Sequence, residues 1–343
     1  MAKIQAKKIV CVGPRKVEIQ DFIIDTANIE RDSFIAKTKW SLISPGTEIG
    51  IYSGENKMVF QKDSWCAYPW DAGYINIAEV VEVGDGIKDL KEGDVVFNFG
   101  PHSSYIKIDT NTPEGLYIVL PETQQNVNSL FARIASISRI SLIVTEKPPG
   151  STVLIYGLGL VGNFCAQLFQ LGGFKTVAVE VIEKRIEWAK ECGIENIVNP
   201  KVVNLKEFSQ EFTKKQGFDI VVDAVGVPDI VCEAVELSAP YGEVILLGTP
   251  KPEMTKSGLA LLNAIHHKFL TVKSGLEWIL FGARSPYTIT MKDNIVFILE
   301  EIEKKRLKVE PLITHKIPYS DIRSAYEGLL NKKDEYLGVI LEW

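Results

Sequence analysis

The segment TVLIYGLGLVGNF, residues 152–164, most constrains how this chain of 343 residues can fold. Its glycines Gly157, Gly159 and Gly162 have G-x-G-x-x-G spacing, between a run typical of a buried strand and an amphipathic helical run. In that context the first glycine allows a tight turn, the second lets the backbone approach a pyrophosphate, and the third lets helix and strand pack closely. The helix amino terminus offers free N–H groups and partial positive charge to phosphates. The segment therefore predicts a dinucleotide-binding turn.

The run TEKPPGS, residues 145–151, separates two sequence patterns. After it, helix-like runs alternate with strand-like runs rich in Val, Ile and Leu, such as TVLIY, KTVAVEV, FDIVVDAVG and GEVILLG. Continuous apolar strands are typical of sheets covered on both faces, so this half predicts a doubly wound parallel sheet of about six strands. Residues 1 to about 120 instead hold short β-branched or aromatic runs separated by Gly, Pro and Asp, which predict a small barrel or sandwich. The tail ends in strand-like YLGVILEW and could return to that β-rich part.

An acidic residue ends the second strand of the predicted sheet. Glu180 follows Gly162 by 180 − 162 = 18 residues, where a carboxylate accepts hydrogen bonds from ribose hydroxyls and would repel a 2′-phosphate. NAD is therefore favoured over NADP. Arg185 could stack on adenine or meet a 2′-phosphate, so NADP stays open as the alternative. The complete set of predicted cofactor-binding residues is Gly157, Gly159, Leu160, Val161, Gly162, Glu180, Arg185, Ala224, Gly226, Gly248, Thr249 and Ser274.

The composition limits which kinds of partner the chain is expected to bind and in which cellular compartment it is expected to lie. The net charge, 38 − 44 = −6, gives no electrostatic reason to bind nucleic acid or an anionic membrane. The five scattered cysteines lack zinc spacing and indicate reduced thiols in a cytosol. The opening MAKIQAKKIVCVG has no long apolar core of a signal peptide, and no apolar run reaches the ~18 residues of a membrane span. We therefore predict a cytoplasmic protein that binds a small-molecule substrate.

Further motifs cover nearly the whole chain. They are GDGIKDLKEGDVVF (84–97), KPPGSTVLIYGLGLVG (147–162), VAVEVIEKRIEWAKECG (177–193), FDIVVDAVG (218–226), GEVILLG (242–248) and the tail LITHKIPYSDIRSAYEGLLNKK. In these motifs the chain resembles the medium-chain dehydrogenase/reductase family, which includes zinc-type alcohol dehydrogenases. The resemblance implies an α/β protein in which a GroES-like β-rich catalytic domain (1–122 and 287–343) is interrupted by a Rossmann NAD-binding domain (123–286). It also implies an active site in the cleft between these domains, and a homodimer or homotetramer formed through the outer edge of the Rossmann sheet.

The resemblance bears on zinc, because the family's usual ligand positions hold other residues here. Aligning PGTE on the family's Cys-Gly-Thr-Asp-like stretch places Pro45 at the ligand cysteine. Aligning AGYINIAEVVEVG on the Gly-His-Glu stretch places Tyr74 and Ile75 at the histidine and glutamate. The segment NSLFARIASIS offers no clear third ligand, and FNFGPHSSYIKID contains none of the cysteines of a structural zinc loop. A catalytic zinc needs about three protein ligands, so we expect no metal; a rebuilt site using His102, Cys66 or Asp71 stays the alternative.

Without zinc, other groups must hold the substrate oxygen while hydride is transferred. The resemblance places Thr47 where zinc members keep a hydroxyl that relays the alcohol proton. Tyr74, which replaces the ligand histidine, is the first candidate, since a phenol with a pKa near ~10 suits a hydrogen-bond donor to a carbonyl oxygen. Glu48 could accept a proton through a relay, and His102 is expected at the cleft rim. For Tyr74, Glu48 and His102, ordinary packing or structural roles stay open.

The segment YSGENKMVFQKDSWCAYPWDAGY is rich in aromatic residues, which suits a sizeable, flat or sugar-like substrate, although it could equally be a packed loop. Together, SPGTE and YPWDAGY are most similar to a subgroup that includes bacteriochlorophyllide-type hydroxyethyl dehydrogenases. We predict a zinc-independent oxidoreductase that transfers a hydride between NAD(H) and a secondary alcohol or ketone, such as a polyol, a sugar-like compound or another cyclic compound. The alternatives are an NADPH-dependent quinone or enoyl reductase and a non-catalytic NAD-binding protein.

Overall fold

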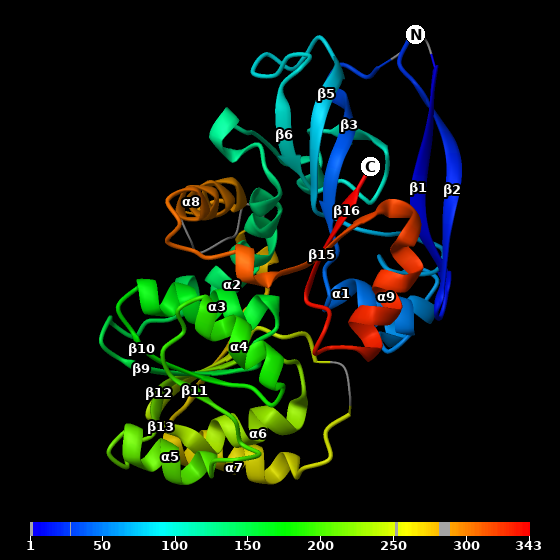
Figure 1. Cartoon of the computed structure of the whole chain (residues 1–343). Helices are drawn as coiled ribbons and strands as arrows, with labels where there is room; N and C mark the ends of the chain where they lie inside the picture. Colours follow the sequence, from blue (N-terminus) through cyan, green and yellow to red (C-terminus); the bar gives the residue numbers. More distant parts are fainter. Residues whose placement is uncertain (1–2, 28, 251–252, 281–288) are drawn as a thin grey trace. The chain divides into compact units, whose positions relative to one another are not determined.

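The computed structural model describes residues 3–27, 29–250, 253–280 and 289–343. The chain forms two compact units (Figure 1). The first contains Met1–Arg133, Ile295–Glu303 and Leu312–Trp343, and the second contains Ile134–Asn294 and Lys304–Pro311. The first unit thus extends past the predicted boundary at 122/123, while the predicted boundary at 286/287 lies outside the described residues.

The second unit is built on a parallel sheet. Within the described residues the sheet has six strands in the order β11-β10-β9-β12-β13-β14, and every neighbouring pair is parallel. The fold class predicted from the alternating runs is confirmed. The strands are β9 (Thr152–Tyr156), β10 (Lys175–Val179), β11 (Ile197–Val198), β12 (Phe218–Asp223), β13 (Ser238–Leu246) and β14 (Thr271–Ser274).

Helices cover both faces of this sheet, which explains why its central strands are apolar throughout. Figure 1 shows α3 and α4 on one face and α5, α6 and α7 on the other. On the second face, Leu154, Val177 and Val221 from the strands form one buried cluster with Phe208, Phe212 and Val235 from the helices. The helices are α2 (Ala132–Val144), α3 (Leu160–Leu171), α4 (Glu183–Glu191), α5 (Leu205–Phe212), α6 (Pro228–Leu237) and α7 (Gly258–Lys268).

The first unit is mainly β-structure. A sheet of seven described strands has the order β15-β16-β3-β5-β6-β8, with β7 paired to β3, and a smaller sheet has the order β2-β1-β4. The C-terminal tail returns to this unit, since β16 pairs antiparallel with β3, placing Ile340 opposite Leu42. The strands are β1 (Lys3–Gly13), β2 (Lys16–Asp25), β3 (Ser33–Leu42), β4 (Trp70–Asp71), β5 (Asn76–Val83), β6 (Val95–Asn98), β7 (Tyr105–Asp109), β8 (Tyr117–Val119), β15 (Ile313–Pro318) and β16 (Gly338–Glu342). The remaining α-helices among the described residues are α1 (Thr47–Ser53), α8 (Met291–Glu303) and α9 (Ile322–Asn331).

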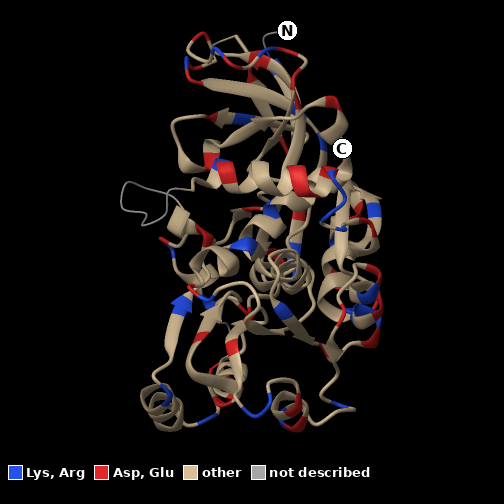
Figure 2. Ribbon diagram, turned by 90° about the vertical axis from the view of Figure 1, so that its left-hand side faces the viewer, with Lys and Arg blue, Asp and Glu red and all other residues tan. Residues whose placement is uncertain are grey.

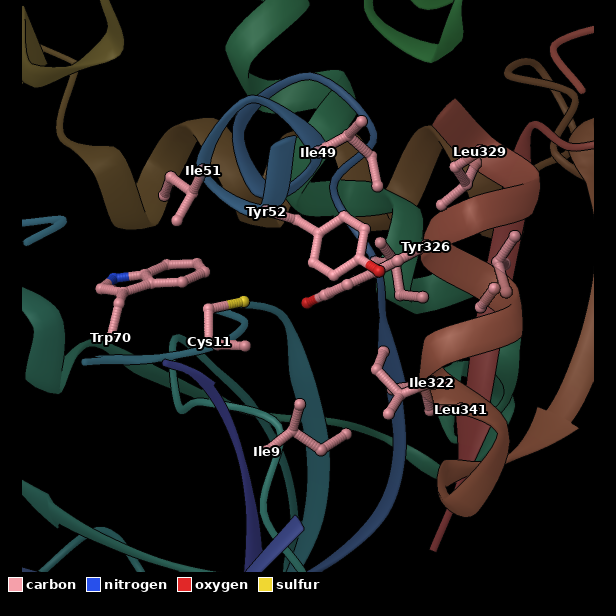
Figure 3. Packing of buried hydrophobic residues seen from close by; sticks show 14 of the residues in the cluster. Ile9, Cys11, Ile49, Ile51, Tyr52, Trp70, Ile322, Tyr326, Leu329 and Leu341 are labelled. Atoms are coloured by element: carbon pink, nitrogen blue, oxygen red, sulfur yellow. The ribbon is translucent and has the colours of Figure 1, made fainter. Parts of the chain in front are cut away.

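A buried cluster fixes the short helix α1 against α9. Figure 3 shows side chains of α1 and α9 meeting beside Cys11 of β1, with Tyr52 and Tyr326 close together. The ring centroids of Tyr52 and Tyr326 are 4.9 Å apart. The helix ends at Gly54, whose left-handed φ of 75° is a conformation that glycine adopts without steric cost. Residues far apart in sequence therefore hold α1, the helix that follows the Pro45-Gly46 turn.

One described stretch, Val127–Val144, is long and apolar enough to cross a membrane, although 67% of it is buried within the structure. Arg133 and Arg139 interrupt this stretch, so it is not the uninterrupted apolar run that the sequence was searched for, and the expectation of no membrane span stays a prediction. A core helix of a globular protein gives the same pattern of burial. In Figure 2, Lys and Arg positions are interspersed with Asp and Glu along the ribbon, as the modest net charge suggested.

Candidate active site

The glycine turn after β9 has the geometry that a dinucleotide phosphate group requires. Gly157 has a φ of +86°, which a residue with a side chain rarely adopts. A Cβ at Gly162 would collide with the Gly157 carbonyl oxygen, so helix α3 and the turn approach as closely as the motif predicts. Helix α3 begins after Gly159, and no side chain caps its first N–H groups. These residues fit a bound diphosphate, which the free N–H groups and helix dipole would hold.

Glu180 lies just after β10, almost completely buried, and backbone groups fix its carboxylate. Its Oε2 accepts a hydrogen bond from Leu158 N at 2.9 Å, and its Oε1 accepts from Val181 N at 2.7 Å and Ile182 N at 3.0 Å. A carboxylate has about four acceptor positions, so at least one stays available for a ribose hydroxyl. The carboxylate is therefore hydrogen-bonded to the glycine turn after β9, and its contact with a ribose stays a prediction.

Arg185 lies beside Glu180. Its Nη1 is 3.9 Å from Glu180 Oε2 and 3.9 Å from the position of a Cβ built on Gly159. Burial lowers the pKa of Arg185, and the nearby Glu180 charge partly offsets that shift. Both charges thus border the phosphate-binding turn, which is why the sequence could not separate NAD from NADP.

The ends of β12 and β13 contribute the other predicted cofactor residues. Gly226 has a φ of +79°, and a Cβ on it would collide with the Thr249 carbonyl. Ala224 lies next to the turn, 3.4 Å from the position of a Cβ built on Gly162, whereas Ser274, the last residue of β14, is exposed. Gly248 packs against the backbone of Gly226.

Asp223, which was not predicted, shapes this part of the site. Its Oδ1 accepts hydrogen bonds from Val225 N at 2.9 Å and Gly226 N at 3.0 Å. Burial raises the pKa of Asp223, and these two backbone N–H groups oppose the rise. The sequence pattern that could have identified Asp223 is an acidic residue at the end of the apolar strand FDIVVD, the same pattern that identified Glu180.

In the first unit, three hydroxyl groups meet where the family resemblance placed the lost zinc ligands. The Tyr74 hydroxyl donates to Ser44 Oγ at 2.5 Å and lies 3.4 Å from Thr47 Oγ1. Tyr74 and Thr47 are half-buried, and Thr47 begins α1. Ser44 was missed, because a serine before a Pro-Gly turn looks like an ordinary turn residue in sequence. The structure brings Tyr74 and Thr47 together as proposed and adds Ser44 to them.

Glu48 and His102 lie in the interior of the first unit. His102 Nε2 is 3.0 Å from Glu48 Oε2, and both side chains are fully buried. The prediction that His102 lies at a cleft rim is wrong, because the segment after β6 turns inward and the His102 ring packs beneath Gly73. His102 Nδ1 is 2.8 Å from Ser41 Oγ, which also accepts from Trp343 Nε1 at 2.9 Å.

Two further groups hold the Glu48 carboxylate. Ser44 N donates to its Oε1 at 2.7 Å, and the Tyr326 hydroxyl of α9 donates to its Oε2 at 2.7 Å. Burial and the Glu48 charge raise the pKa of Tyr326 far above its ordinary value, so this hydroxyl stays a donor. Glu48 thus joins the turn at Ser44 to α9, and its contact with the hydroxyl group of Tyr74 runs through Ser44.

Comparisons with known proteins show which proteins this chain is similar to. Residues 161–276 match the sequence model of a family described as zinc-binding dehydrogenase. The chain is 24% identical over 291 residues to an uncharacterized zinc-type alcohol dehydrogenase-like protein of Escherichia coli, covering 76% of this chain and 79% of that one. It is 27% identical over 292 residues to alcohol dehydrogenase 1 of Cenchrus americanus, covering 83% and 74%.

Solved structures show the same fold. Galactitol-1-phosphate dehydrogenase of Escherichia coli superposes with a TM-score of 0.81 at 18% identity, covering 98% of this chain and all of that one. Two further dehydrogenase structures contain a nicotinamide cofactor. One from Escherichia coli holds NADH (TM-score 0.78, 19% identity, 99% of each chain), and one from Sinorhizobium meliloti holds NADP (TM-score 0.77, 17% identity, 99% of this chain and 100% of that one).

In sequence, the chain is thus similar to zinc-type alcohol dehydrogenase-like proteins, and residues 161–276 match the zinc-binding dehydrogenase model. The relatives named are alcohol dehydrogenases or proteins like them, and two of the solved structures with this fold hold NADH or NADP. The site residues of this dehydrogenase-like chain nevertheless do not fit the family's metal. Proline and isoleucine side chains at positions 45 and 75 have no donor atom, and the Tyr74 hydroxyl is hydrogen-bonded to Ser44.

The alternative metal ligands do not converge either. His102 contacts Glu48 in the interior, Cys66 is buried beside Ser64, and Asp71 pairs with Lys8 at 2.9 Å. In the part of the chain that the structure describes, no three His, Cys, Asp or Glu side chains are grouped so that they could hold a metal ion. The donor set around Tyr74 therefore does not fit a catalytic zinc, which needs about three protein ligands.

Proposed function

We propose that this chain transfers a hydride between NAD(H) and a secondary alcohol or ketone, and that it does so without zinc. The observation that carries the proposal is the Tyr74 hydroxyl, held 2.5 Å from Ser44 Oγ and 3.4 Å from Thr47 Oγ1. By the alignment on the family motif, Tyr74 stands at the position of a metal-binding histidine in zinc-type members, where the metal polarises the substrate oxygen. A hydroxyl cluster supplies donors and acceptors at that oxygen without a cation.

The proposed roles follow from the hydrogen bonds. A bound nicotinamide would supply or accept the hydride at the substrate carbon. In ketone reduction, Tyr74 donates its proton to the carbonyl oxygen, where negative charge develops. Ser44 and Thr47 hold the Tyr74 hydroxyl and offer positions through which the proton is replaced. Glu48 and His102 do not touch the substrate in this proposal; they anchor the turn through Ser44 N.

The preference for NAD rests on Glu180. Its carboxylate is fixed at the phosphate-binding turn, where it favours ribose hydroxyls over a 2′-phosphate. Arg185, 3.9 Å away, weakens that discrimination. Fluorescence titration with NADH and NADPH tests the proposal, with tighter NADH binding expected and Glu180→Ala expected to reduce the difference. Clear preference for NADPH would instead favour the reductase of activated C=C bonds.

The substrate class is proposed from the aromatic segment after α1. Phe60 and Trp65 are both 61% exposed, and the Trp65 ring packs edge-on against Trp70 with centroids 6.4 Å apart. Exposed rings of this kind stack on flat or sugar-like rings. We therefore propose a polyol, sugar-like or other cyclic alcohol. Trp65→Ala should raise KM for such substrates and leave KM for a short acyclic alcohol unchanged.

A panel of secondary alcohols and ketones with NAD(H) tests the activity itself. Tyr74→Phe should lower kcat about 10²-fold, which is typical of a lost acid–base group, and leave the Kd for NADH within about twofold. Tyr105→Phe, a half-buried tyrosine of β7, is the matched control. Elemental analysis should find well under one zinc per chain. NADH binding without turnover on any substrate would favour the non-catalytic alternative, and stoichiometric zinc would refute the metal-free site.

We also propose a homo-oligomer formed through β14, the end strand of the described parallel sheet. An open strand edge pairs readily with a second copy, and Val272 of β14 and Leu262 of α7 are both exposed. Light scattering coupled to size exclusion should give a dimer or tetramer. Val272→Lys should dissociate it, whereas Leu171→Glu, an exposed position at the end of α3, should not. A monomeric wild-type protein would overturn this assignment.

A further inference from the structure

A buried arginine lies beside the Tyr74 ring. The guanidinium carbon of Arg133 is 5.4 Å from the Tyr74 ring centroid and 4.4 Å from the Phe99 ring centroid. Arg133 is only 3% exposed, and Phe99 is 8% exposed. Both distances are within the ~6 Å over which a cation and an aromatic ring attract each other.

Arg133 also lies in a notable segment of the sequence. Arg133 belongs to NSLFARIASIS, the segment in which a third zinc ligand was sought and not found. Burying a charged group is costly unless the surroundings use or compensate its charge. An arginine cannot give up its proton in a protein, so its positive charge is permanent. The fold therefore keeps a fixed positive charge next to the residue that replaces a metal-binding histidine.

We propose that the Arg133 guanidinium stabilises negative charge on the Tyr74 hydroxyl oxygen and on a substrate oxygen bound to it, thereby doing electrostatically what zinc does in other members. The inference rests on the proposed function only for the substrate oxygen; the effect on Tyr74 itself can be measured without any substrate. Arg133 acts through Tyr74 and is a positioning residue.

The other reading is that Arg133 only fills the space between two aromatic rings. The two readings differ when the charge is removed and the volume is kept. Arg133→Met retains a long apolar side chain that packs well on rings, and Arg133→Lys keeps the charge while losing the planar group. Arg139→Met makes the same exchange six residues along α2, at an arginine that donates to Asn294 Oδ1 at 3.0 Å.

The first experiment titrates Tyr74 in the absence of substrate, using ¹³Cζ-labelled tyrosine and NMR, with the Tyr74 signal assigned from Tyr74→Phe. Two titratable groups lie close by among the described contacts: Glu48, reached through Ser44, and His102, which packs under Gly73. These groups stay in place in every Arg133 variant. Arg133→Met should raise the Tyr74 pKa by about one unit or more, as expected for loss of a positive charge at this range. Arg133→Lys should raise it less, and Arg139→Met should leave it unchanged.

The second experiment measures turnover of the holoenzyme. Arg133→Met should lower kcat by about 10- to 10²-fold with the Kd for NADH unchanged, and Arg133→Lys should recover part of the loss. A folded Arg133→Met protein with an unshifted Tyr74 titration would overturn the inference, whatever its turnover. A full loss of kcat that Arg133→Lys does not relieve at all would do the same. If Tyr74→Phe kept full activity, the proposed function would fail, while the titration would still report whether Arg133 acts on Tyr74.

Discussion

Replacing Glu48 by leucine tests whether this carboxylate is a structural anchor. Three groups contact it inside the first unit: Ser44 N at 2.7 Å, the Tyr326 hydroxyl at 2.7 Å and His102 Nε2 at 3.0 Å. Leucine has a similar volume but no polar atom, so all three partners would be left unsatisfied in a region without solvent. Each unsatisfied buried group costs about 1–3 kcal/mol.

The expected loss for Glu48→Leu is therefore at least about 3 kcal/mol of local unfolding free energy, counting the lower limit for each of three groups. Glu48→Gln keeps an acceptor and adds a donor, so it should lose about 1–2 kcal/mol. Glu327→Leu is the matched control. Glu327 also accepts a tyrosine hydroxyl, that of Tyr52 at 2.8 Å, but its own side chain is 31% exposed, so its carboxylate is partly solvated. It should lose about 1 kcal/mol or less.

Hydrogen exchange followed by mass spectrometry suits this test, because a chain with two compact units need not unfold in one transition. In Glu48→Leu, peptides that cover α1 and α9 should exchange about 10²-fold faster, the factor that corresponds to about 3 kcal/mol. Peptides of the parallel sheet and the Kd for NADH should not change. If the peptide that covers α1 exchanged at the same rate in wild type and in Glu48→Leu, the anchoring role would be refuted. Glu48 would then again be a candidate proton relay.

The remaining predictions concern the turn, the hydroxyl cluster and the thiols. Gly162→Ala should abolish NADH binding in a titration, since its Cβ would collide with the Gly157 carbonyl oxygen; retained binding would mean that the turn does not hold the cofactor. Ser44→Ala should lower kcat about 10-fold by releasing the Tyr74 hydroxyl, and steady-state kinetics that match wild type would exclude this role. Burial raises the pKa of three thiols to about 12 from an ordinary value of 9.0, so the folded state keeps protons that the unfolded state releases. Stability should therefore be full below pH 9 and fall as the pH rises toward 12, by about 1.4 kcal/mol per thiol at pH 10. Urea unfolding at pH 8 and pH 10 checks this prediction. Replacing Cys11, Cys165 or Cys192 by serine should make the loss of unfolding free energy between these pH values smaller.

Much of the second unit could be predicted from sequence because its signals are local. A strand, its glycine turn and the following helix occupy consecutive residues, and the conformations at Gly157 and Gly162 follow from the absence of a side chain. The acid ending a strand, Glu180, was found for the same reason. The choice between NAD and NADP was not determined, since Arg185 approaches Glu180 only through the packing of α4 beside the turn.

The sequence by itself determined the parallel sheet, the tight glycine turn after β9 and the absence of usual zinc ligands at positions 45, 74 and 75, because each depends on residue type at fixed spacing. Only the tertiary structure decided what surrounds Tyr74. Ser44 comes from the turn after β3 and Arg133 from the start of α2, while the distant His102 and Tyr326 anchor Glu48. Such contacts between residues up to 278 positions apart depend on how the elements pack, and no local pattern encodes them. That is why His102 was expected at a rim and lies in the interior.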